Sequence, residues 1–315
     1  MKKWILGAVV SLLSLFFLFQ SFSLEEFDRL NGQMQWIFLP VLFGTMTLAF
    51  VPFSFRWYLL LDKRIPFWQA FRTAVIGVSL NLVLPARGGD LLRLVMVKNQ
   101  TGIGIPSLLS QLFLEKVLDL GTVVLVGGVA LLLLGLGTGD NLLLVFLSGG
   151  AIILMITILF LLRKFRDPFR NFLRKISEKL SLLTFYETKI DHHLIAFQKD
   201  ISGNRLLLPL LISPPTWVLG YATNYFITGL LIGQTFSPIE CLLFIFVGAM
   251  GVAIPSAPSG IGVFHASIVS GFLLLGREPG LGFVYATVLH LTQMVLMLLL
   301  AGILALLGGF KRKET

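Results

Sequence analysis

The amino-acid sequence predicts an all-α polytopic membrane protein, with six full spans and two re-entrant helical hairpins that form an inverted repeat. Of its 315 residues, 56% are hydrophobic and 13% are charged, whereas roughly 25% of the residues in an average soluble domain are charged. Several apolar runs reach the ~20 residues that a helix needs to cross a ~30 Å hydrocarbon core. Two further apolar stretches, Asn81 to Arg93 and Ile254 to His265, are interrupted by prolines and glycines. We expect spanning helices along most of the chain and broken helices at these two stretches.

The first two spans follow from apolar runs and from the charges beside them. Lys2-Lys3 place the N-terminus in the cytoplasm, because basic residues gather on that side. The run at 4–20 also has the layout of a signal peptide, but we expect it to remain as a first helix. It leads to an acidic external loop at 25–28. Span two, at 36–61, then returns the chain to the cytoplasm.

The next segment predicts a re-entrant hairpin. Residues 67–84 are apolar but barely long enough to cross, and they end at Pro85 and a glycine pair before the chain returns to Lys98. Irregular backbone is tolerated within a membrane only where protein or a water-filled cavity satisfies its polar groups. We therefore expect the tip of this hairpin to be enclosed or wet.

The same order of elements recurs further along the chain. The remaining spans are predicted at 107–134, 142–162, 206–232 and 281–307. Between the last two, apolar arms at 238–254 and 263–275 flank a break rich in proline and glycine, which predicts a second hairpin entering from the outside. This count places both termini in the cytoplasm.

These elements divide one membrane domain into two related halves. We expect a single domain over 1–315, with a first helix and external loop (1–35), a first repeat (36–134), a linking span with a basic segment (135–205) and a second, inverted repeat (206–308). Asp90 lies 25 residues before Glu115, and His265 lies 25 before His290. Paired interrupted segments in corresponding positions are the best sequence indication of a transporter's binding site.

The charge distribution indicates contact with lipid and excludes nucleic acid as a partner. The net charge of +9 is concentrated at the N-terminus, at 163–205 and in the C-terminal tail. Segment 163–205 has apolar residues at helical spacing. It is interpreted either as an amphipathic element lying on the anionic cytoplasmic leaflet or as a solvated linker helix joining the two halves.

No metal site or cofactor is predicted. His192 and His193 follow Asp191, but adjacent histidines point to different faces of a helix, so a surface position is favoured. The glycines at the two breaks lack a strand-plus-helix context, and no Walker A pattern occurs, which excludes a nucleotide site.

The first break carries the strongest candidate binding residues. A 14-residue arm reaches ~21 Å, so both hairpin tips lie near the middle of the bilayer. The helices that start near Gly89 and Gly262 each offer backbone N–H groups and a positive dipole end to an anion. Arg87 and Arg93 are suited to bidentate contact with phosphate. Asp90 could hold these arginines or contact a cationic headgroup; alternatively, the three charges only lock the hairpin.

Two carboxylates of span three lie on one helical face. Glu115 and Asp119 are four residues apart, and Glu115 sits ~14 Å deep. A carboxylate at that depth should pair with Arg87, Arg93 or Lys116, or titrate in a proton relay. A structural salt bridge to the hairpin is the alternative.

His265 and His290 occupy the equivalent places in the second half. Each is either a hydrogen-bonded packing residue or one of a proton-coupled pair, because the imidazole pKa is ordinarily near 6.5. Asn81, Asn224 and Gln293 could line the cavity or bridge helices.

Three motifs resemble the flippase-like family that includes the membrane region of lysylphosphatidylglycerol synthases. They are NLVLPARGGDLLR from Asn81, LEKVLDL from Leu114 and PSAPSGIGVFHA from Pro255. The resemblance transfers site roles to a set of matching positions: Asn81, Pro85, Arg87, Gly89, Asp90, Arg93, Glu115, Asp119, Pro258, Gly260 and Gly262. Three positions depart from the family pattern. Asp90 and His265 stand where the family usually has Glu, and His290 stands where Arg is frequent.

The resemblance implies movement of a lipid between leaflets of the prokaryotic cytoplasmic (inner) membrane, without catalysis. The expected substrate is a phospholipid or a polyprenyl-linked lipid. Its binding site is predicted from Asn81, Arg87, Gly88, Gly89, Asp90, Arg93, Glu115, Asp119, Pro258, Gly260, Gly262, His265 and His290. One alternative is a membrane-embedded enzyme acting on a lipid-linked substrate, and another is a membrane partner of a glycosyltransferase or of lipid synthesis.

Overall fold

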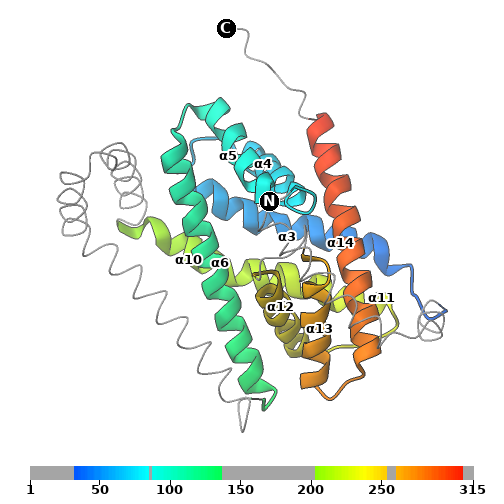
Figure 1. Cartoon of the computed structure of the whole chain (residues 1–315). Helices are drawn as coiled ribbons and strands as arrows, with labels where there is room; N and C mark the ends of the chain where they lie inside the picture. The colour runs from blue at the N-terminus through cyan, green and yellow to red at the C-terminus, as the bar shows by residue number, and fades with distance from the viewer. Residues whose placement is uncertain (1–31, 85–86, 137–202, 254–259, 308–315) are drawn as a thin grey trace, which may run out of the picture.

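The computed structural model describes residues 32–84, 87–136, 203–253 and 260–307, and every element in these ranges is helical (Figure 1). Three helices are long and apolar enough to cross a membrane: α3 (Phe38–Leu60), α6 (Ile105–Leu133) and α14 (Pro279–Leu307). They agree with the spans predicted at 36–61, 107–134 and 281–307. The spans predicted at 4–20 and 142–162 lie outside the described residues, as does nearly all of the basic segment 163–205.

The segment predicted as one span at 206–232 is built from successive helical pieces. They are η4 (Gly203–Leu206), α10 (Leu207–Pro215), the π-helical η5 (Thr216–Ala222) and α11 (Thr223–Leu231). Pro214 and Pro215 have no backbone N–H to donate, so the regular hydrogen-bond ladder is interrupted where α10 ends. The chain continues as a π-helix, a form that is frequent at functional sites.

Two pairs of short helices lie on either side of the predicted breaks. The first pair is α4 (Phe67–Leu80) and α5 (Gly88–Thr101), and the second is α12 (Pro238–Ala253) and α13 (Val263–Leu274). The helices of each pair pack against each other. With 12 to 16 residues, each is shorter than the ~20 residues of a spanning helix.

The long helices connect the two pairs in a reciprocal way. Helix α6 packs on α5 and on α12, whereas α14 packs on α13 and on α4. The α6–α12 contact is close, because Gly127 meets the Phe246 ring, and Ser79 of α4 donates a hydrogen bond to the Met297 carbonyl of α14 at 3.0 Å. In Figure 1 the pairs lie toward opposite ends of α6 and α14, and α3 and the α10–α11 run cross between them.

A constant offset in sequence relates the two halves. Asp90 and Glu115 each lie 175 residues before a histidine, His265 and His290 respectively. The same shift moves α5 onto 263–276 and α6 onto 280–308, within two residues of the observed bounds of α13 and α14. These two helices of each half therefore share their order and, within two residues, their bounds at this offset.

Aromatic packing holds the second half together. Phe244 and Phe272 stack with ring centroids 4.8 Å apart, and Phe236 and Tyr285 meet edge to face at 5.1 Å. The Tyr285 hydroxyl donates a hydrogen bond to the Tyr225 carbonyl at 2.7 Å, which joins α14 to α11. This buried group fixes α12, α13 and α14 relative to one another.

Glycine permits the closest approach within the first pair. A Cβ atom at Gly89 would lie 2.0 Å from the Gly77 carbonyl oxygen and 2.7 Å from the Asn81 backbone nitrogen. Both neighbours are backbone atoms, so a side chain at position 89 would force α4 and α5 apart. The glycine therefore sets the distance at which α5 begins.

We predict that Gly89→Ala lowers the free energy of unfolding by about 1–3 kcal/mol, the usual cost of overpacking. Thermal unfolding of the purified protein in detergent measures this change. Gly44→Ala is the matched control, because nothing lies within 4 Å of a Cβ placed at Gly44. Equal melting temperatures for the two variants would contradict the close contact.

Candidate functional site

The start of α5 is held by a side chain from the end of α4. The Asp90 backbone N–H donates to the Asn81 side-chain oxygen at 3.0 Å. This bond satisfies one of the donors that a helix start otherwise leaves unpaired. Asn81 therefore acts across the break as a cap, and it does not line the cavity described below.

An ion pair with no solvent exposure joins α5 to α6. Arg93 Nη2 lies 2.8 Å from Glu115 Oε1, and both side chains are 0% exposed. The Arg93 guanidinium lies over the Trp57 ring of α3, 4.1 Å from its centroid. Arginine suits such a position because its planar group can stack on a ring while it binds a carboxylate. Three helices thus meet at one guanidinium.

A lysine and a second carboxylate complete this group. Lys116 Nζ lies 3.3 Å from both Asp90 Oδ2 and Glu115 Oε1, and Asp90 Oδ1 lies 3.9 Å from Arg93 Nη2. We call Asp90, Arg93, Glu115 and Lys116 the Arg93 cluster. It has two positive and two negative charges. Glu115 thus pairs with two of the three partners that the sequence allowed, and Lys116, 32% exposed, is the cluster's most accessible member.

A second ion pair lies beside the cluster. Arg56 Nη2 of α3 is 2.6 Å from Asp119 Oδ1, and Arg56 Nη1 donates to Ser213 Oγ at 2.9 Å. Asp119 also accepts a hydrogen bond from Trp217 Nε1 at 3.0 Å. The sequence interpretation missed Arg56. The sequence did contain an indication of its importance. Arg56 is a charged residue inside an apolar span, and placing a charge there is as costly as placing the charges of 81–93 in the membrane.

Several buried polar atoms of both pairs have no hydrogen-bond partner among the described residues. They are Arg93 Nε, Arg93 Nη1, Arg56 Nε, Asp90 Oδ1 and Glu115 Oε2. Leaving such atoms unpaired costs about 1–3 kcal/mol each. Both ion pairs therefore retain buried donors and acceptors that no described residue satisfies.

Arg87 lies at the tip of the first pair in an unusual conformation. It is exposed and precedes α5 with φ +56°, in the left-handed region. That region costs a non-glycine residue roughly 1–2 kcal/mol. The offset of 175 aligns Arg87 with Gly262, which precedes α13 with φ +87°. The first half thus keeps an arginine where the second half has the residue that fits without strain.

The second tip brings the two predicted histidines together. The rings of His265 and His290 have centroids 5.4 Å apart, and both side chains are buried near Phe264 and Phe283. No hydrogen bond or ion pair within the described ranges joins them to the Arg93 cluster. Among the described residues, the predicted site residues thus form two contact groups, and their joint role in one binding site stays a prediction. Gly260 also has a positive φ of 72°, and Pro258 lies outside the described residues.

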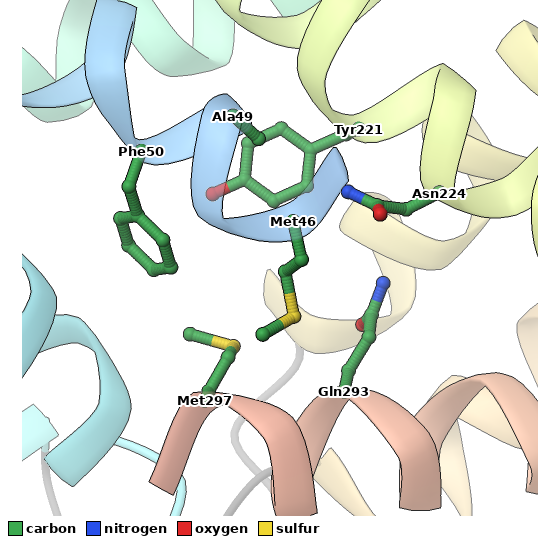
Figure 2. Close-up of a pocket in the computed structure, with 7 residues that line it drawn as sticks. All are labelled: Met46, Ala49, Phe50, Tyr221, Asn224, Gln293 and Met297. Atoms are coloured by element: carbon green, nitrogen blue, oxygen red, sulfur yellow. The ribbon is translucent and has the colours of Figure 1, made fainter. Parts of the chain in front are cut away.

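A small cavity lies between the two halves (Figure 2). Its volume is ≈ 30 Å³, which is room for about two water molecules and far below the ≈ 300–1,000 Å³ of a ligand pocket. Figure 2 shows the Asn224 and Gln293 amides pointing toward each other across it. Its lining residues are Met46, Ala49, Phe50, Tyr221, Asn224, Gln293 and Met297.

The cavity connects to the charged groups through aromatic contacts. Tyr221 stacks on Trp217 with ring centroids 4.7 Å apart, and Trp217 binds Asp119. The Thr45 hydroxyl of α3 donates to the Asn224 side-chain oxygen at 2.9 Å. Trp217 and Tyr221 therefore link Asp119 to the wall of the cavity. In the described part of the chain, no group of three or more His, Cys, Asp or Glu could hold a metal ion.

Comparison with known protein families identifies the family of this chain. The family described as the lysylphosphatidylglycerol synthase TM region matches residues 4–301. The chain belongs to this family, and with its candidate spans it is a multi-pass membrane protein. Comparisons with curated proteins and with solved structures gave no match.

We predict that Arg56→Met lowers the free energy of unfolding by about 3–5 kcal/mol, because it leaves the Asp119 carboxylate without its cation. The double variant Arg56→Met/Asp119→Leu should recover most of this loss, since neither charge remains. Unfolding of both variants in detergent tests the pair. A double variant as unstable as Arg56→Met would show that the ion pair is not the source of the loss.

Proposed function

We propose that this protein is a lipid transporter that moves a phosphate-containing lipid between the leaflets of the prokaryotic cytoplasmic membrane. The observation that carries the proposal is the buried Arg93 cluster beside the break between α4 and α5. Charged side chains inside membrane segments are costly, and they commonly mark the pathway of a substrate. Membership of a membrane family named for phospholipid synthases supports a lipid substrate.

In this proposal the two helix pairs are re-entrant hairpins of an inverted repeat, 36–134 and 206–308. Their arms are too short to span, the long helices contact them reciprocally, and one offset relates both halves. With the spans expected at 4–20, 142–162 and 206–232, the protein has six spans and two cytoplasmic termini. Transporters with such repeats bind substrate near the middle of the bilayer, between the halves.

Arg87 and the cluster would act in sequence on the headgroup. Arg87 is exposed at the hairpin tip, where its guanidinium can first meet a phosphate. Arg93 Nε and Nη1 are unpaired donors deeper in the protein, and each could donate a charge-assisted hydrogen bond to a phosphate oxygen. The strained backbone of Arg87 supports a role for this side chain, because strain persists mainly where function needs it.

Movement of the halves would carry the headgroup across. The α6–α12 and α14–α4 contacts each join one half to the other, so rocking at these interfaces opens the centre to one side at a time. The acyl or prenyl chains remain in lipid, along the exposed apolar faces of the long helices. The driving force is an ion gradient, a partner or the lipid's own gradient.

We predict that Arg87→Ala and Arg93→Ala each reduce lipid movement at least tenfold, as expected when about 1.4 kcal/mol or more of phosphate binding is removed. The measurement is the loss of dithionite-accessible fluorescence from nitrobenzoxadiazole-labelled phosphatidylglycerol in phosphatidylcholine vesicles that contain the protein.

Two controls accompany this experiment. Arg64→Ala removes an exposed arginine outside the break and should leave the rate unchanged. Labelled glucosylceramide, which has no phosphate, should not be moved. Wild-type rates of lipid movement in both Arg87→Ala and Arg93→Ala would contradict the proposed site. Chemical conversion of the lipid would favour the membrane-enzyme alternative.

A further inference from the structure

The charges around Glu115 balance before any lipid binds. Arg93 and Asp90 come from α5, Lys116 and Asp119 from α6, and Arg56 from α3. Together with Glu115 they make three positive and three negative charges. Helix α10 carries no titratable side chain, η5 contributes the Tyr221 hydroxyl, and on α12 Glu240 is paired with Arg277. The site is therefore neutral when empty.

A phosphate headgroup upsets this balance. The inference rests on the proposed function, in which a lipid phosphate binds Arg93. One bound phosphate would leave one surplus negative charge in a place where Arg93 and Glu115 are both 0% exposed. Buried charge without a partner is strongly unfavourable, and the usual response is that a group changes its protonation state. A cation must therefore accompany the phosphate.

The positions of the unpaired atoms around Arg93 identify the group that binds this cation. Arg93 uses Nη2 for Glu115 and leaves Nε and Nη1 unpaired, so a phosphate can bind the same guanidinium without first displacing Glu115. Three anions, the phosphate, Glu115 and Asp90, would then share two cations, Arg93 and Lys116. Such neighbours titrate together, and one of them becomes protonated. Glu115 Oε2 is the unpaired oxygen beside this position, and Asp90 retains Lys116 at 3.3 Å.

We propose that one proton is carried with each lipid phosphate, bound on Glu115 Oε2 while the headgroup occupies Arg93. The proton comes from water on the side where the lipid enters and returns to water on the other side. An O–H bond of hydronium breaks as the Glu115 O–H bond forms, and on the other side the Glu115 O–H bond breaks as hydronium forms again. For a singly charged headgroup the loaded site is neutral, so transport follows a pH gradient and is indifferent to membrane potential.

The test uses the full chain in phosphatidylcholine vesicles with labelled phosphatidylglycerol. At one pH unit of gradient, a lipid moved with one proton redistributes between leaflets about tenfold toward the less acidic side. Dithionite accessibility reports this distribution, and pyranine inside the vesicles reports proton entry with the lipid. A potassium–valinomycin potential at equal pH should leave the distribution unchanged. Glu115→Gln should abolish the response to pH, whereas Glu240→Gln, which removes a carboxylate at the start of α12, should keep it.

Each outcome decides the question. Wild-type protein that moves lipid without redistribution in the pH gradient would overturn the coupling, and so would Glu115→Gln protein that still responds. The wild-type measurement alone is sufficient if the variant does not fold. No movement of lipid at any pH would instead overturn the proposed function itself.

Discussion

The buried Arg93–Glu115 ion pair is the constraint on which the rest of the structure depends. Removing both charges from water is costly, and only good geometry with further contacts offsets that cost. The surrounding features supply those contacts. Trp57 lies under the guanidinium, Lys116 shares the carboxylate, and the close approach at Gly89 lets α5 begin where Arg93 reaches Glu115. The first pair of short helices is therefore organised around a charge pair.

The two halves share geometry but not chemistry. In each half, a residue of the first turn of the returning short helix lies near one on the following long helix, Asp90 with Glu115 and His265 with His290. The first pair belongs to a cluster of four charges, whereas the second sits among aromatic rings. Under the function proposed above, the phosphate would bind in the first half, and the second half would be the packed body against which the first moves.

The features that could be predicted from the sequence are those that depend on local residue patterns. Runs of apolar residues located α3, α6 and α14, and the proline and glycine breaks located both pairs of short helices. The contacts of Arg56 with Asp119 and of Arg93 with Trp57 join helices far apart in the chain, and no local spacing reports such contacts. The π-helix η5 was also missed, since Pro214 and Pro215 indicate an interruption but not the register that follows it.

One double variant tests most directly whether the ion pair binds substrate in addition to holding the fold. Arg93→Met/Glu115→Met removes both charges and keeps side chains of similar volume, a change that is often neutral or stabilising for a buried pair. Asp90 and Lys116 remain to balance each other. The account predicts a protein that unfolds at about the wild-type temperature yet moves no phosphatidylglycerol. A stable variant that transports lipid at the wild-type rate would contradict it.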